Sequence, residues 1–193
     1  MAGRIRTIPF FWRFAAAGGL LFAFTALTCA PMGGRDLYDS QSCRFRSEKN
    51  RCELTLPSGD QWQGRAPGDA STGIIFEASN PSKLLYLFFA AETLNSDLED
   101  YYLLLKMSNR LDQKPAYEFF GQSTESVQGV EALRFVYAAD VDDTSIGRQR
   151  FVYVNVLFKK GKMNYRLIVY TLQEAYDRKK DLIEQVVQGV RFL

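Results

Sequence analysis

The chain of 193 residues contains no histidine at all. Histidine is the usual general base near neutral pH and the commonest metal ligand in proteins. Its absence excludes Ser-His-Asp and Cys-His catalysis and most zinc and non-haem iron sites. The sequence also lacks a Gly-rich phosphate loop and a nucleophile elbow. We therefore expect a protein that is not an enzyme, with no catalytic residue and no cofactor.

An excess of basic charge is also missing. The formal charge is +2 at pH 7, but Arg4, Arg6 and Arg13 all precede residue 29, which leaves 21 basic and 22 acidic residues in the remainder. Nucleic-acid-binding domains carry a basic stripe that lies along the phosphate backbone. A nearly neutral chain without such a stripe is not expected to bind nucleic acid.

The first residues have the organisation of an export signal. Arg4, Arg6 and Arg13 provide a positive stretch, and residues 14–28 form an uncharged apolar run. A positive stretch followed by an apolar run of this length is typical of a signal peptide. The positive end stays in the cytoplasm and the remainder crosses the membrane. We expect residues 1–28 to be a signal peptide and the rest of the chain to be exported.

The end of the apolar run indicates how the chain is held at the membrane. Ala26-Leu27-Thr28-Cys29 resembles a bacterial lipobox, in which the cysteine receives the lipid, although Ala26 and Thr28 depart from the usual residues. Cys29 is therefore the predicted lipidation site, and the periplasmic face of a bacterial membrane is the predicted location. Two alternatives stay open: residues 14–32 are long enough for an uncleaved membrane anchor, and a soluble secreted form is the third.

The number of cysteines supports the lipid. Three cysteines are an odd number for an exported chain, in which an unpaired thiol needs an explanation. Cys43 and Cys52 lie in two short segments, 42–47 and 51–57, that could form a hairpin. A disulfide between them would close a loop of about ten residues and stabilise the fold by roughly 2.5–3 kcal/mol. A lipid on Cys29 and a Cys43–Cys52 disulfide account for all three. Two free thiols in a reducing compartment are the alternative, against which the export signal argues.

The pattern after the signal predicts a flexible tether at 29–42 and one folded domain at 43–193. Beyond the cysteine hairpin, period-two patterns and turn residues predict the strands: 60–65, 73–78, 84–91, 117–128, 130–139, 149–158, 163–172 and 190–193. Residues 84–90 are apolar on both faces, which indicates a strand covered on both sides. Helices are expected from about residue 95 to 114 and from 173 to 188. Strands, a helix, antiparallel strands and a second helix give an α+β fold, an antiparallel sheet with helices packed on it.

This order, from about Leu54 to Leu193, resembles the PsbP-like superfamily, which includes the bacterial DcrB-type lipoproteins. The matching segments are Leu56-Pro57-Ser58-Gly59-Asp60-Gln61-Trp62, Leu94 to Tyr101, Val127-Gln128-Gly129-Val130-Glu131-Ala132, Tyr165-Arg166-Leu167, Tyr176 and Val190-Arg191-Phe192. The resemblance implies an α-β-α sandwich and a non-catalytic accessory or binding role outside the inner membrane. Photosynthetic members support assembly of a metal cluster, and no ligand positions here carry that role over.

Three acidic residues are the weak candidates for a metal site. Asp140, Asp142 and Asp143 could offer oxygen ligands to a hard cation. Their segment lacks the spaced ligands and central glycine of an EF-hand loop. A solvated turn between two strands is therefore the preferred interpretation.

Two basic groups and one aromatic pair are the candidates for surface binding. Lys159, Lys160 and Lys162 are expected at a hairpin tip and Arg178–Lys180 on the second helix, where they could meet anionic headgroups or simply be solvated. The adjacent rings of Phe119 and Phe120 should point to opposite sides of a strand. The sequence does not say which of these rings is exposed.

The sequence therefore predicts a membrane-tethered envelope lipoprotein that binds a partner protein or ligand as an accessory factor. A structural or assembly component of an envelope complex is the alternative, and it would show a flat apolar patch. A carboxylate-only enzyme is the third hypothesis, and it would need a pocket holding two acids, one with a raised pKa.

Overall fold

The computed structural model describes residues 36–59, 61–67, 73–143 and 147–193. These residues belong to one compact unit of the chain. The predicted signal peptide, the predicted lipid site Cys29 and the first half of the predicted tether lie outside the described residues.

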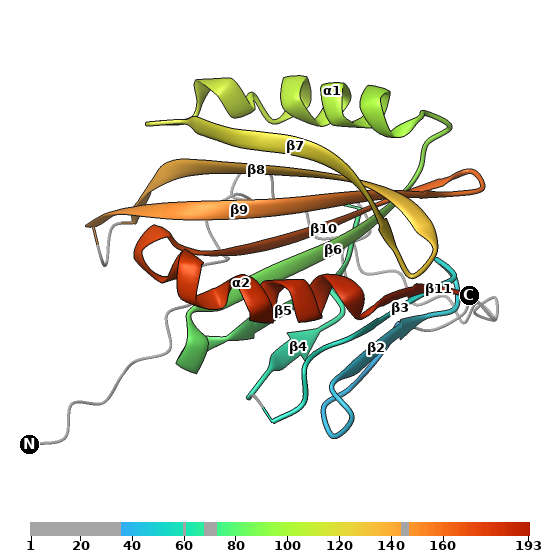
Figure 1. Cartoon of the computed structure of the whole chain (residues 1–193). Coiled ribbons are helices and arrows are strands. Elements are labelled where there is room, and N and C mark those ends of the chain that lie inside the picture. Colours follow the sequence, from blue (N-terminus) through green and yellow to red (C-terminus); the bar gives the residue numbers. More distant parts are fainter. Residues whose placement is uncertain (1–35, 60, 68–72, 144–146) are drawn as a thin grey trace, which may run out of the picture. The chain divides into compact units, whose positions relative to one another are not determined.

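A large antiparallel sheet forms the centre of this unit (Figure 1). Its seven strands are arranged in the order β4-β5-β6-β10-β9-β8-β7. Their bounds are β4 Gln63–Arg65, β5 Ile74–Asn80, β6 Leu85–Thr93, β7 Glu118–Val127, β8 Val130–Asp143, β9 Gly147–Lys160 and β10 Met163–Leu172. The meander from β7 to β10 predicted by the sequence is confirmed.

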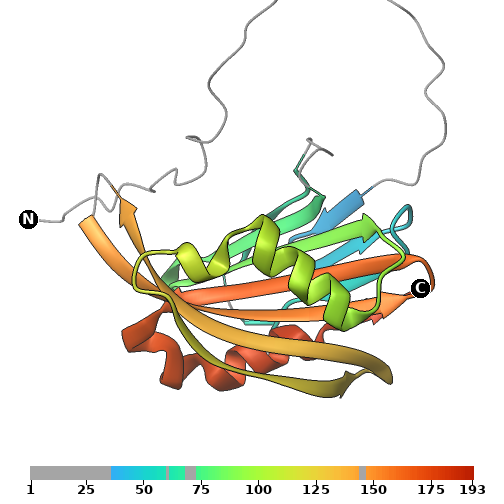
Figure 2. The ribbon, with the colours of Figure 1, turned by 90° about the horizontal axis from the view of Figure 1, so that it is seen from above.

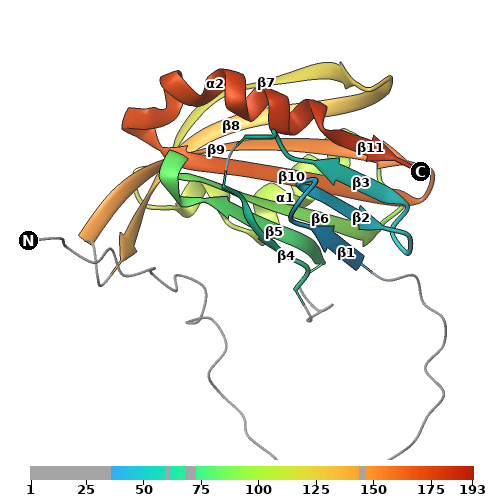
Figure 3. The ribbon, with the colours of Figure 1, turned by 90° about the horizontal axis from the view of Figure 1, so that it is seen from below.

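A second, smaller sheet and a helix cover one face of the large sheet (Figure 3). The small sheet has the order β1-β2-β3-β11, with β1 Asp36–Asp39, β2 Arg44–Ser47, β3 Cys52–Thr55 and β11 Val190–Phe192. Helix α2, Gln173–Gln188, packs against β9 and β10 and leads directly into β11. The main core lies between these layers, and it includes Phe45, Phe89 and Val186, all fully buried.

Helix α1, Leu98–Ser108, covers part of the opposite face of the large sheet (Figure 2). Asp97 caps the helix, because its carboxylate accepts a hydrogen bond of 2.8 Å from the amide of Asp100. Tyr101 and Leu105 point inward onto β8 and β9 and form a second core cluster with Phe135 and Leu157. The two core clusters give the α+β sandwich expected from the sequence.

Two features of this helix face differ from the expectation. The helix ends at Ser108, not near residue 114, and a short 3-10 turn, Leu111–Gln113, follows it. Strand β6, expected to be covered on both faces, is fully covered only on the small-sheet side, since α1 lies over β8 and β9. Tyr86 and Phe88 on its other face are therefore only half-buried.

The folded domain begins earlier than predicted. Residues 36–39, which were expected to belong to the tether, form β1 and pair with β2. The alternation within β1 explains the difference, because Tyr38 points inward and its ring lies 5.1 Å from that of Phe76, while Leu37 points outward. A short polar segment is thus held by one aromatic contact and a strand ladder.

The predicted Cys43–Cys52 disulfide is not formed. Both cysteines are buried and free. The hairpin register places Cys52 opposite Ser47, and Cys43 is four residues before Ser47. At about 3.4 Å per residue the two cysteines are roughly 13 Å apart along the strand, whereas bridged Cα atoms lie about 4.4–6.8 Å apart. The hairpin as folded excludes this bridge.

Candidate binding groove

An open groove of about 820 Å³ lies between α2 and strands β7 and β8. It exists because α2 packs over β9 and β10 and leaves the neighbouring strands uncovered on this face. Its floor is formed by small or apolar residues, among them Gly121, Ser123, Val136 and Val152. Polar residues of α2 line one wall, and Phe120 of β7 lines the other.

A β-bulge in β7 shapes the Phe120 wall. Phe119 pairs with Tyr137, but the next paired residue is Gly121, opposite Val136, so Phe120 is the extra residue. Gly121 has a φ of 144°, which side-chain-bearing residues rarely adopt. Both phenylalanine side chains are 44% exposed. Phe119 lies opposite Tyr137 of the second core cluster and therefore faces the α1 side, whereas Phe120 lines the groove on the α2 side. The two rings thus point to opposite sides of the strand, as expected, and neither ring is covered.

Arg134 connects the two sides of the groove, strand β7 and helix α2. Its guanidinium donates hydrogen bonds to Glu125 of β7 at 2.8 Å and to Glu184 of α2 at 2.7 Å. Burial alone would lower the pKa of Arg134, but these two carboxylates raise it. Partial burial opposes the shift at Glu184, and hydrogen bonds from Gln188 and Arg134 nevertheless hold its pKa below the usual value. Arg134 therefore fixes the spacing between the helix and the edge of the sheet.

The outer rim on α2 carries charge of both signs. Lys180 pairs with Asp177 at 2.7 Å, and its ammonium lies 5.2 Å from the centre of the Tyr176 ring. The hydrogen bond to Asp177 raises the pKa of Lys180. These side chains are exposed, so the ion pair contributes little to stability. They are available to a ligand in the groove.

Two smaller hollows lie elsewhere on the surface. One of about 320 Å³ lies beside the start of α1, lined by Asp97, Glu99, Glu131 and Lys159. The other, of about 610 Å³, lies between the small sheet and the end of α2, lined in part by Arg44, Glu53 and Arg191. Glu53 is almost fully buried and accepts a hydrogen bond from Arg44. The α2–β7 groove is larger than either.

The acidic candidates all lie in the last four residues of β8 and not in a solvated turn. Asp140 accepts hydrogen bonds from Arg148 at 2.6 Å and from Arg150 at 3.2 Å. The hydrogen bond from Arg148, together with that from Arg150, lowers the pKa of Asp140. Asp142 is exposed in β8, and the backbone of Asp143 pairs with Gly147. Both Asp140 oxygens are thus used by arginines, which leaves this cluster poorly suited to a cation.

Neither a metal centre nor a membrane span is found in the described part of the chain. Among the described residues, no group of three or more cysteine, aspartate and glutamate side chains is arranged to hold a metal ion. Within the same ranges, no helix has the length and hydropathy needed to cross a bilayer.

The basic candidates are divided between two elements. Lys159 and Lys160 end β9, and Lys162 follows in the turn to β10. Arg178–Lys180 lie on α2, where only Lys180 lines the groove. Sequence reasoning missed the groove itself, because its walls come from strands and a helix far apart in the chain. The adjacent Phe119-Phe120 pair was the one local sign of it.

No protein-family model matches the sequence, and no curated protein matches it significantly. Solved structures do match. The PsbP protein (CyanoP) of Synechocystis sp. PCC 6803 has a TM-score of 0.59 and 18% identity, over 86% of this chain and 98% of that chain. A Bacteroides thetaiotaomicron protein has a TM-score of 0.52 and 12% identity, over 78% of this chain and 48% of that chain. The PsbP-like α+β fold expected from the sequence is confirmed, and identities this low show the fold alone.

Proposed function

We propose that this protein is an exported, membrane-tethered accessory module that holds an extended segment of a partner protein in the α2–β7 groove. The observation that carries this proposal is the groove of about 820 Å³ beside the exposed Phe120. A half-exposed aromatic residue at the edge of a concave surface is a common anchor point in protein interfaces. The PsbP-like fold is compatible with such an accessory role but does not fix it.

The position of β7 supports an extended segment as the occupant. Strand β7 is the last strand of the large sheet, and among the described residues its outer edge has no strand partner. An edge strand presents unpaired N–H and C=O groups to which another chain can add a strand. Most of its ten residues are exposed. A segment paired with this edge would direct every second side chain toward the groove.

The groove also indicates the chemistry of that segment. Phe120 and Tyr176 provide apolar surface on opposite walls, so an apolar side chain of the partner fits between them. Asp177 and Lys180 on the rim can exchange their mutual ion pair for contacts with polar groups of the partner. We propose an extended segment with one apolar anchor residue and polar flanks.

The proposed tether rests on the sequence before residue 36. A positive stretch, an apolar run and Cys29 precede the domain. A lipid on Cys29 or an uncleaved anchor would both hold the domain on the outer side of the membrane. Location in the envelope and the absence of catalysis are parts of the same proposal.

Photo-crosslinking from both walls tests the groove. A photo-crosslinking amino acid replaces Phe120 in one variant and Asp177 in another, in the full chain within native membranes. The control variant carries it at Met107 on α1, which is 77% exposed and lies on the opposite face of the sheet. We expect mass spectrometry to find one short stretch of one partner linked to both groove positions and not to Met107. Separate, unrelated products at the two walls would contradict the proposal.

A structural or assembly role is the second candidate, and the outer face of α1 favours it. Leu103, Leu104 and Met107 are 51%, 47% and 77% exposed. Three large apolar side chains on the outside of one helix are typical of a surface that another protein covers. Strong crosslinking of a partner from Met107, with little from Phe120 and Asp177, would favour this function over the groove.

A further inference from the structure

The small sheet and the β9–β10 hairpin together carry a concentration of basic side chains at one end of the domain. We define the basic corner as Arg46, Lys49, Arg51, Lys160, Lys162 and Arg191. Two contacts hold its parts together. The Tyr165 hydroxyl donates a hydrogen bond of 2.6 Å to the carbonyl oxygen of Asn50, and the Leu193 amide donates one of 2.8 Å to the carbonyl oxygen of Arg51. The β2–β3 turn, the β9–β10 hairpin and β11 therefore meet at this corner.

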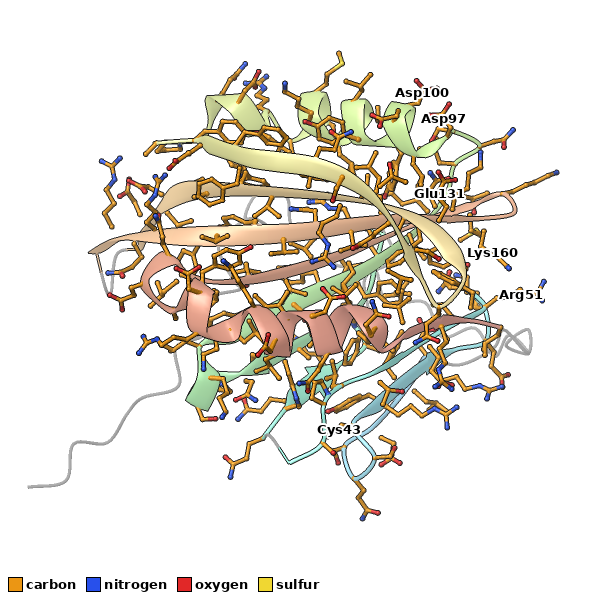
Figure 4. All side chains as sticks on the ribbon, in the orientation of Figure 1. Cys43, Arg51, Asp97, Asp100, Glu131 and Lys160 are labelled. Atoms are coloured by element: carbon orange, nitrogen blue, oxygen red, sulfur yellow. The ribbon has the colours of Figure 1, made fainter. Side chains whose placement is uncertain are left out.

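The charges of this corner are only weakly compensated. Two acidic residues lie beside it: Asp36, at the start of β1, and Glu48. Glu48 pairs with Arg46 at 3.5 Å, with both side chains about half exposed or more. Glu53 is buried beneath Arg44 and is neutralised by it. The acidic residues Asp97, Asp100 and Glu131 lie at the same end but on the side of α1 (Figure 4). Lys160 and Arg51 lie on the side of the small sheet, so the positive field points away from α1 (Figure 4).

The chain enters the domain at this same corner. Asp36, the first described residue, lies opposite Ser47, the last residue before the β2–β3 turn. Cys29 is seven residues earlier, and seven extended residues span at most about 25 Å. A lipid on Cys29, or an anchor that ends at residue 32, would therefore keep the basic corner close to the membrane surface.

An apolar side chain is available beside these charges. Four residues form a row across the small sheet. Leu37 lies opposite Arg46, Arg46 lies opposite Glu53, and Glu53 lies opposite Arg191 of β11. Residues directly opposite each other in neighbouring strands share one face of the sheet. This row is the outward face, since Phe45 and Leu54 on the other face are fully buried. Leu37 is 62% exposed, and it is the kind of apolar residue that can enter a headgroup layer beside basic side chains.

We infer that the basic corner, with Leu37 beside it, is a membrane-docking surface that binds the headgroups of anionic phospholipids. The inference rests on the tether of the proposed function and adds to it a defined orientation. With the corner on the membrane, α1 faces away, because α1 and the small sheet lie on opposite faces of the large sheet (Figure 1). Basic residues near an anionic surface each strengthen membrane binding by about fivefold.

The test uses the full chain reconstituted into vesicles of phosphatidylcholine with phosphatidylglycerol. A photo-crosslinking amino acid replaces Leu37 in one variant and Met107 in the control. We expect crosslinks to phosphatidylglycerol from position 37 and few from position 107. The double variant Lys49→Gln with Arg51→Gln should lower crosslinking at position 37 severalfold or more. The matched variant Lys106→Gln with Arg110→Gln, at the end of α1, should not change it.

Four outcomes would overturn the inference. Equal crosslinking from positions 37 and 107 would contradict the orientation in which the basic corner faces the membrane and α1 faces away. Crosslinking at position 37 could persist in the Lys49→Gln, Arg51→Gln variant or in vesicles of phosphatidylcholine alone. Either result would contradict binding of the basic corner to anionic headgroups. In these cases the chain still sediments with the vesicles, so the tether stands. A chain that does not sediment at all would overturn the tether and this inference together.

Discussion

The hydroxyl of Tyr165, in the large sheet, donates a hydrogen bond of 2.6 Å to the carbonyl oxygen of Asn50, in the turn of the small sheet. Tyr165 is 1% exposed and Asn50 is 9% exposed, so water cannot readily replace the bond. Burial raises the pKa of Tyr165 to about 12, which keeps the hydroxyl protonated as a donor. This bond joins the two layers of the main core across 115 residues of sequence.

Removing this hydroxyl should weaken the fold. In Tyr165→Phe the Asn50 carbonyl oxygen loses its donor in a buried place, and we expect the free energy of unfolding to fall by about 1–3 kcal/mol. Urea denaturation followed by circular dichroism measures the change. Tyr86→Phe is the control, because the Tyr86 hydroxyl is half-buried and has no hydrogen bond within the described part of the chain. Equal loss in both variants would contradict the assignment.

The two cysteines of the β2–β3 hairpin should remain unbridged. Cys52 lies opposite Ser47, and Cys43 is four residues away from that position. We expect peptide mapping of the native protein without reductant to yield no Cys43–Cys52 link. Burial raises the pKa of Cys52 to about 12, so its thiol should react with an alkylating agent only after unfolding. A linked peptide would show that the hairpin adopts another register.

The cysteine result shows what the sequence could and could not predict. The hairpin itself follows from two strand-like segments around a polar turn, and the structure has it at β2 and β3. Facing cysteines would need the chain to reverse at residues 47–48. The turn instead spans residues 48–51, and this displacement of two residues moves every cross-strand partner by four. Register depends on how the turn packs, which a single sequence does not specify.

The groove could not be predicted from the sequence, for a related reason. Period-two and helical patterns predicted β7, β8 and α2 separately, and the resemblance predicted the sandwich. The width of the groove depends on which strands α2 covers, and its wall depends on a bulge at Phe120. Neither follows from local pattern, because the sequence around Phe119 and Phe120 also fits a regular strand. Of the small sheet, the β2–β3 hairpin and β11 were expected as strands, whereas β1, which is only four residues long, was assigned to the tether.

The bulge should be sensitive to one glycine. A methyl group at Gly121 would meet no atom within 4 Å, but the φ of 144° is itself unfavourable for alanine. We expect Gly121→Ala to lower the free energy of unfolding by about 1–3 kcal/mol and to weaken crosslinking of the partner from position 120. Ser123→Ala, on the same floor of the groove, should change stability by less than about 0.5 kcal/mol. Gly121→Ala with unchanged stability would mean that the bulge is not strained.

The lipid on Cys29 has its own test. Cells are grown with a fatty-acid analogue, and labelling of the full chain is compared with that of Cys29→Ala. We expect a labelled wild type and an unlabelled variant, because the cysteine of the lipobox is the only proposed acceptor. Equal labelling of both proteins would remove the lipid from Cys29. Absence of label from both, with the protein still in the membrane fraction, would favour the uncleaved anchor.

The buried thiol and phenol groups should make the fold less stable at alkaline pH. Burial raises the pKa of Cys52, Tyr153 and Tyr165 to about 12 each. In the unfolded chain these groups ionise near pKa 8.5 for cysteine and about 10 for tyrosine. The protonated forms of these groups contribute fully to the free energy of unfolding below the pKa values of the unfolded chain. This contribution is lost as the pH rises toward 12. The unfolded state then binds fewer protons than the folded state, so the free energy of unfolding falls with pH.

Cys52 should account for the first part of this loss. Between pH 8.5 and pH 10 one such group costs about 2 kcal/mol, at 1.36 kcal/mol per pH unit. We expect urea denaturation at pH 7, 9, 10 and 11 to show this decline in the wild type. In Cys52→Ala the decline should begin about 1.5 pH units higher, where the tyrosines begin to ionise in the unfolded chain. The comparison uses the slopes with pH, since removing a buried thiol lowers stability at every pH. Identical slopes in the two proteins below pH 10 would show that Cys52 ionises as freely in the folded chain as in the unfolded one.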